Sequence, residues 1–195
     1  MSKEKVELIV LAERGVERAT FHIPTEKSDE LKGWKLIGFY STKDKFHPSV
    51  AYKSCDDEFK EIGCIPETLD KLNDFVYYWN IMGIDKRKTL VSLVNESYYT
   101  LDDALKRALT GKSYITSVSK PPLKEQQDEV LGQFYAAAVI DYKIGGIATC
   151  FDKSTALEYY FDYEAYGRDI RLNGENGYWS EMYDRWVVNP IGHLE

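Results

Sequence analysis

Residues 157–172 read LEYYFDYEAYGRDIRL and place four tyrosines, a phenylalanine and several carboxylates around Arg168 and Asp169. A core segment excludes so many acids, and a solvated helix excludes so many aromatic rings. The spacing predicts a helix over residues 153–165 that ends before Gly167. Its apolar side would carry Ala156, Leu157, Tyr160 and Phe161.

The segments on either side complete a C-terminal α+β unit. Downstream, RDIRL and YWSEMYDRWVVN are typical of strands around the turn NGENG. Upstream, residues 126–143 predict a long helix that stops at Gly145-Gly146. Its inward-facing residues would be Val130, Leu131, Phe134, Ala137 and Ala138. Because Pro121-Pro122 fits neither a helix interior nor a central strand, we place a domain boundary there.

The middle of the chain predicts three short helices. In the first, Pro66 fits the first helical position, and apolar residues recur three and four apart. They are Leu69, Leu72, Val76 and Trp79. A second helix is predicted over DKRKTLVSLVNE, and a third has Thr100 as its N-cap and Gly111 after its end.

The N-terminal part predicts strands at residues 6–11 and 34–40, with a short helix over 25–32 that Gly33 ends. Together these patterns predict an α+β fold built as an elongated chain of three small domains. The domains would be an α+β unit over 1–62, a helical unit over 63–122 and an α+β unit over 123–195.

Composition restricts the class of protein. The chain has 195 residues, 44% of them hydrophobic, and a net charge of −7. No apolar run is long enough to cross a membrane, and the N-terminus lacks the pattern of a signal peptide. The three cysteines lack the spacing of metal ligands and suit a reducing compartment. We expect a cytoplasmic protein.

The acidity is concentrated in the last third. Residues 123–195 contain six Lys/Arg against 13 Asp/Glu, whereas acids and bases balance over residues 1–122. The negative electrostatic potential of such an acidic region repels nucleic acid and attracts basic surfaces. We therefore expect no direct binding to nucleic acid.

Catalytic patterns are absent from the sequence. The three histidines, His22, His47 and His193, are far apart, and no nucleophile elbow, zinc-protease or phosphate-loop motif occurs. Glu158 and Asp162 would share a helix face, and such paired acids can bind Mg²⁺ or transfer protons. A solvated acidic face is the favoured interpretation, so we expect no enzyme, no cofactor and no metal.

The segment YFDYEAYGRDIRL resembles the antirestriction motif of the ArdA-type antirestriction proteins, which has the form Y-x-D-Y-x-x-x-G-R-D-L. Here the motif positions are filled by Tyr160, Asp162, Tyr163, Gly167, Arg168 and Asp169, with Ile170 in place of leucine. IPETLDKLNDFVYYW, SYYTLDDALKRAL and DEVLGQFYAAAVIDY resemble helices of the family in the same order. ATFHIPTEKSDEL is similar to its N-terminal strand and acidic helix.

This resemblance implies an inhibitor rather than an enzyme. Members of the family are elongated, curved, three-domain dimers that mimic a bent DNA duplex, occupy the DNA-binding groove of type I restriction-modification enzymes and protect incoming mobile DNA. The implied acidic, partner-binding surface comprises Asp128, Glu129, Asp141, Asp152, Glu158, Asp162, Glu164, Asp169 and Glu175. The implied motif core and homodimer contact comprise Tyr160, Phe161, Tyr163, Tyr166, Gly167 and Arg168.

Two alternatives remain open at this point. One is an ArdA-like adaptor or regulator of a mobile element that binds another protein partner. The other is an acid-dependent enzyme that uses Glu158, Asp162 or Asp169. A continuous line of carboxylates on the folded chain favours mimicry of DNA, whereas faces of mixed charge favour the adaptor.

Overall fold

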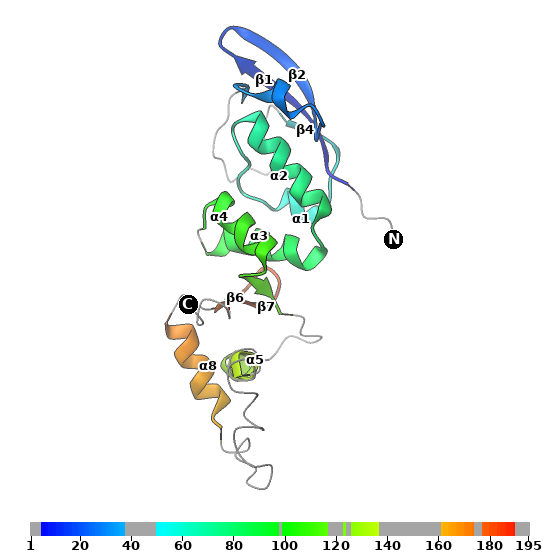
Figure 1. Ribbon diagram of the computed structural model, residues 1–195. Helices are drawn as coiled ribbons and strands as arrows, with labels where there is room; N and C mark the ends of the chain where they lie inside the picture. Colours follow the sequence, from blue (N-terminus) through cyan, green and yellow to red (C-terminus); the bar gives the residue numbers. More distant parts are fainter. Residues whose placement is uncertain are drawn as a thin grey trace. The chain divides into compact units, whose positions relative to one another are not determined.

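The computed structural model describes residues 5–37, 50–97, 99–116, 123, 126–136, 161–173 and 177–189 (Figure 1). The chain forms two compact units, Met1–Leu109 and Thr110–Glu195. An antiparallel sheet and a group of helices make up the first unit, and a small three-stranded sheet with helices makes up the second. The mixed α+β class is therefore confirmed.

Strand β1 (Glu7–Arg14) is the centre of the N-terminal sheet. Its alternate residues Leu8, Val10 and Ala12 are buried, with the period of two that a half-buried strand requires. Strand β2 (Glu17–Ile23) returns antiparallel along β1 from Arg14 to Leu8 after a tight turn. Strands β3 (Lys35–Leu36) and β4 (Val50–Ser54) pair with the opposite edge of β1.

The prediction for this sheet was incomplete. Strand β1 matches the predicted strand at 6–11, and β3 lies within the one predicted at 34–40, whose last three residues are outside the described part. Strand β2 was not predicted. Ile23 is the one fully buried residue of this strand, so its apolar pattern is weak. The predicted short helix is the 3₁₀ turn η1 (Ser28–Leu31), and Gly33 follows with a φ of +81°.

The predicted middle helices are present as α2 (Leu69–Ile81), α3 (Ile84–Glu96) and α4 (Leu101–Thr110), after the single turn α1 (Asp57–Lys60). The four apolar residues predicted to face inward on α2 are all buried. Helix α4 begins after the predicted N-cap, because the Thr100 hydroxyl accepts from the N–H of Asp103 and donates to the Asp103 carboxylate.

Helix α2 begins three residues after Pro66, so the prediction that Pro66 is the first helical residue was wrong. The reason is a contact with strand β3. The N–H of Leu36 donates to the carbonyl oxygen of Glu67 at 2.8 Å, and the N–H of Leu69 donates to that of Trp34 at 3.0 Å. These bonds keep the chain extended until Thr68, which becomes the N-cap.

Two asparagines attach α2 to the sheet. The amide of Asn73 accepts from the N–H of Thr25 at 2.7 Å and donates to its carbonyl oxygen at 3.2 Å. Seven residues later, Asn80 makes the same pair of bonds to the backbone of Val6, at 2.8 and 3.0 Å. The Asn80 amide therefore supplies hydrogen-bond partners to backbone groups just before β1, and the Asn73 amide does so just after β2.

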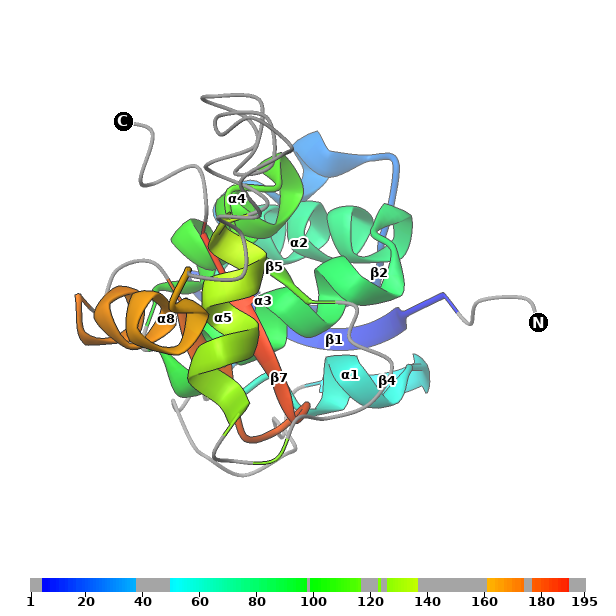
Figure 2. The same ribbon diagram turned by 90° about the horizontal axis from the view of Figure 1, so that it is seen from below.

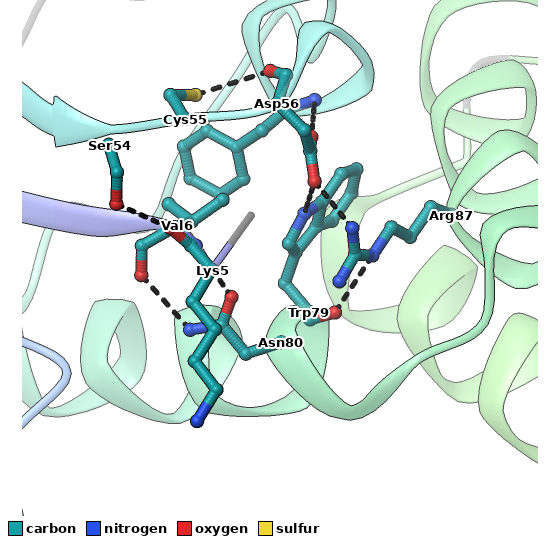
Figure 3. A network of polar contacts seen from close by, with 9 residues as sticks. Lys5, Val6, Ser54, Cys55, Asp56, Trp79, Asn80 and Arg87 are labelled. Carbon is teal, nitrogen blue, oxygen red and sulfur yellow. Dashed lines mark hydrogen bonds and ion pairs between the residues drawn. The ribbon is translucent and has the colours of Figure 1, made fainter. Parts of the chain in front are cut away.

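A network around Asp56 joins α1, α2 and α3 (Figure 3). The Asp56 carboxylate caps α1 by accepting from the N–H of Phe59, and it also accepts from Nε1 of Trp79 at 3.0 Å. It forms an ion pair with Arg87, whose side chain is only 4% exposed. Arg87 Nε donates to the Trp79 carbonyl oxygen at 3.0 Å.

The C-terminal unit is a sheet covered by helices. Strands β5 (Tyr114–Ile115), β7 (Arg185–Val188) and β6 (Gly177–Ser180) pair antiparallel in that order. Helix α5 (Gln127–Tyr135) lies between β7 and α8 (Tyr163–Leu172) (Figure 2). Their buried core consists of Leu131, Tyr135, Ile170, Trp186 and Val188.

Two predictions for this unit were wrong. RDIRL is the second half of α8 rather than a strand, because Ile170 continues the helical spacing of residues 163 and 166 and is buried in the core. YWSEMYDRWVVN is not a single strand, because its residues form β6 and β7 with a hairpin turn at residues 181–184 between them. Residues 137–146 and 153–160, which carry the rest of both predicted helices, lie outside the described part.

The sequence predicts three domains with boundaries near residues 62 and 122, whereas the structure divides into two units, Met1–Leu109 and Thr110–Glu195. Within the first unit, the asparagine bonds join the predicted N-terminal and middle domains. The arrangement as three domains stays a prediction.

We expect replacement of Arg87 by methionine to lower the free energy of unfolding by about 3–5 kcal/mol, because it leaves the Asp56 carboxylate, whose side chain is only 15% exposed, without its cation. Urea unfolding followed by circular dichroism measures this change. Lys60→Met is the matched control, since its ion pair with Asp57 is solvent-exposed and should contribute about 0–1 kcal/mol. Equal effects of the two substitutions would contradict the role assigned to Arg87.

Candidate functional site

The ArdA-like segment forms the start and body of α8. Asp162 is the N-cap, and its Oδ1 accepts from the N–H of Ala165 at 2.8 Å. Phe161, just before the cap, packs edge-on against Tyr166 with 5.4 Å between ring centroids. This arrangement is a hydrophobic staple, which fixes how the chain enters a helix. At least two of the aromatic residues in this unusually acidic and aromatic segment therefore stabilise the start of a helix.

Gly167 lies in the middle of α8 and marks its closest approach to α5. A Cβ atom built on Gly167 would lie 1.8 Å from the carbonyl oxygen of Asp128, and one on Gly132 would lie 1.8 Å from that of Tyr163. The two helix backbones thus touch at a pair of glycines. The prediction that Gly167 ends a helix was wrong, because here the missing side chain makes room for a neighbouring helix.

Asp128 and Arg171 join the same two helices through an ion pair. Arg171 Nε and Nη2 donate to the two oxygens of Asp128 at 2.7 and 2.9 Å. The Asp128 carboxylate raises the pKa of Arg171 above its ordinary value, mainly through this hydrogen bond. Among the predicted partner-binding acids, Asp128 is therefore already neutralised within the unit.

The other described acids of this segment face solvent. Glu164 lies 4.0 Å from Arg168, one turn later, and both are exposed. Glu129 accepts from the Gln133 amide but, like Asp162 and Asp169, has no ion pair among the described residues. Helix α8 thus separates its exposed acids from a face that buries Gly167 and Ile170.

Two further exposed acids, Glu181 and Asp184, lie in the turn between β6 and β7. Neither was predicted as part of the acidic surface. Both lie within YWSEMYDRWVVN, whose pattern predicts a single strand, so the turn that exposes them was not evident from the sequence. Of the predicted site residues, Asp141, Asp152, Glu158, Tyr160 and Glu175 lie outside the described part.

The tyrosines of this unit supply bulk rather than charge. Burial raises the pKa of Tyr135 far above its ordinary value, and burial also raises the pKa of Tyr114 and Tyr166. These phenols stay neutral at physiological pH. The negative charge of the candidate surface therefore comes from carboxylates.

The described residues offer no further support to the catalytic alternative. Asp162, one of the acids considered for catalysis, already accepts a hydrogen bond as a helix cap. Within the described ranges, no group of three or more His, Cys, Asp or Glu could hold a metal ion. No helix in the described part of the chain is long and apolar enough to span a membrane.

We expect Gly167→Ala to lower the free energy of unfolding by about 1–3 kcal/mol or more, because the new methyl group requires the backbones of α5 and α8 to separate. Urea unfolding measures the loss. Gly83→Ala is the control, since a Cβ there meets no atom within 4 Å and only the helix cap is weakened, by less than about 1 kcal/mol. A Gly167→Ala protein as stable as the parent would disprove the contact.

Comparisons with known proteins do not assign the chain to a family. No protein-family model matches it. Neither the search of curated proteins nor the search of solved structures finds a match. The function is therefore argued from the residues and the geometry of the site.

Proposed function

We propose that the chain is a DNA-mimicking antirestriction protein that binds and inhibits type I restriction-modification enzymes and so protects incoming mobile DNA. The proposal combines the resemblance of residues 160–172 to the ArdA-type motif with the charge of the C-terminal unit. The observation that carries it is the imbalance of charge from residue 123 onward.

In that part of the chain, the described arginines are all engaged within the unit. Arg168 lies near Glu164, Arg171 holds Asp128, and Arg185 donates to the carbonyl oxygen of Thr116 at 3.2 Å. Five described carboxylates there have no ion pair with a described residue: Glu129, Asp162, Asp169, Glu181 and Asp184. This excess of negative charge is available to a basic partner.

A surface of this kind suits an enzyme that normally binds DNA. Duplex DNA carries about one charge per 1.7 Å of axis, and the proteins that bind it neutralise those charges with lysine and arginine. Carboxylates on a rigid pair of helices can occupy the same basic groove. The nonpolar face of α8 stays in the core, so binding requires no unfolding of the motif.

The resemblance further implies a homodimer joined through residues 123–195, and we include that dimer in the proposal. Leu172, at the end of α8, is 69% exposed and provides apolar surface for a contact with a second copy. Sedimentation of the chain at micromolar concentration tests this part separately.

An observation on the N-terminal unit favours a second candidate, an ArdA-like adaptor or regulator that binds another protein partner. Many acids of that unit are paired with neighbouring lysines or arginines. The paired acids are Glu7, Glu13, Glu17, Asp29, Glu30, Asp57 and Asp102, all in solvent-exposed ion pairs. Such a mixed surface does not resemble a row of phosphates, so we assign mimicry to the C-terminal unit.

We expect inhibition to depend on the summed charge of this unit. Exposed charge pairs contribute about 0.2–1 kcal/mol each, so Glu129→Gln, Asp169→Asn or Glu181→Gln alone should weaken binding at most about fivefold. The combined variant should be progressively weaker, and added salt should weaken binding further because the Debye length is about 8 Å at physiological ionic strength. The assay is displacement of DNA from a type I restriction enzyme by increasing amounts of the protein.

The matched control for this series is the double substitution Asp128→Asn with Arg171→Gln, which removes one acid and the base that compensates it. It leaves the net charge of the unit unchanged, so inhibition by the folded protein should stay nearly unchanged. Loss of all inhibition through one substitution in a folded protein would contradict mimicry, since removing one catalytic group typically costs about 10²–10⁴-fold. Failure of the parent protein to displace DNA would favour the adaptor.

A further inference from the structure

A groove in the N-terminal unit lies beside α2 and has a volume of about 480 Å³. Its ends are set by the two asparagines that attach the helix to the sheet. Asn73 binds the backbone of Thr25, and Asn80 binds the backbone of Val6, beside Lys5 (Figure 3). Seven helical residues separate these attachments, which corresponds to about 10 Å at 1.5 Å per residue.

The two ends of the groove differ in charge. Glu26 follows Thr25, and Asp74 follows Asn73, so two exposed carboxylates line one end. Neither has an ion pair with any residue in the described part of the chain. Lys5 lines the other end, next to Val6 and Asn80. The groove therefore complements a ligand that carries a positive group at one end and a negative group at the other.

Apolar groups line the groove along its length. Pro24 precedes Thr25, Tyr77 lies on α2 between the two asparagines, and Ile81 follows Asn80; Tyr77 and Ile81 are 57% and 62% exposed. The apolar surface continues beyond the groove to Tyr78, whose ring lies 5.9 Å from that of Tyr77. Clustered exposed apolar side chains of this kind mark sites of protein interaction. A surface that extends past the groove fits a polypeptide better than a small molecule.

We propose that this groove binds a short extended peptide segment of a partner protein. The segment carries a basic side chain for Glu26 and Asp74, an apolar side chain for Tyr77 and Ile81, and an acidic group for Lys5. An extended chain rises about 3.3 Å per residue, so about three residues span the distance between the two asparagines. This inference does not rest on the proposed inhibition of restriction enzymes, because it uses only the N-terminal unit.

The test is a titration of the full-length, ¹⁵N-labelled protein with the peptide acetyl-Gly-Arg-Leu-Leu-Glu-Gly-amide, followed by NMR. The order-reversed peptide acetyl-Gly-Glu-Leu-Leu-Arg-Gly-amide is titrated in parallel, because the groove does not fix the direction of the chain. At least one of them should shift the amide resonances of Asn73, Tyr77 and Asn80. A peptide with glutamine in place of both charged residues should bind at least about fivefold more weakly.

Substitutions in the protein locate the binding. Asp74→Asn and Glu26→Gln should each weaken it about twofold to fivefold, and Tyr77→Ser should weaken it about tenfold. The matched controls are Glu67→Gln and Val16→Ser, an exposed acid and an exposed apolar residue that do not line the groove, and they should change binding less than twofold. The proposal is overturned if neither charged peptide shifts these resonances. It is also overturned if the control substitutions weaken binding as much as those in the groove.

Discussion

The backbones of α5 and α8 touch where Gly132 faces Gly167, and the C-terminal unit depends on this contact. A side chain at either position would place a carbon 1.8 Å from a carbonyl oxygen of the other helix. The close approach lets Leu131, Tyr135 and Ile170 pack into one core with strand β7. It also leaves the exposed acids of α8 on the side away from that core.

Helix α5 is attached to β7 near both of its ends. Trp186 Nε1 donates to the carbonyl oxygen of Gln127 at 2.8 Å, and the N–H of Asn189 donates to the Tyr135 hydroxyl at 3.2 Å. Specific polar bonds thus fix the helix over the sheet, while the glycine pair fixes α8 against it. In the N-terminal unit, polar side chains have the same role, since Asn73, Asn80 and the Asp56–Arg87 pair hold α2 in place.

The two units differ in how their charges are arranged, and the proposals follow from that difference. Ion pairs between neighbours neutralise many acids of the N-terminal unit, where the surface beside α2 adds exposed aromatic and aliphatic groups. Acids of the C-terminal unit exceed the available cations. We therefore propose a basic groove as the partner of the C-terminal surface and a peptide with both charges as the partner of the groove beside α2.

The sequence by itself determined the features that local chemistry controls: the alternation of β1, the apolar spacing of α2, and the capped start of α4 at Thr100. Asp162, Glu164 and Asp169 of the motif are exposed, as acids in an aqueous solvent are expected to be. Tertiary structure decided the rest. Gly167 indicates a helix end when only its neighbours are considered, but Gly132, 35 residues earlier, makes it a contact site inside a helix. Pairing with β3 likewise delayed the start of α2, and the partner of Asp128 is Arg171, 43 residues away. Such contacts join residues far apart in the chain, so they cannot be predicted from periodicity or turn propensity, which depend on neighbouring residues.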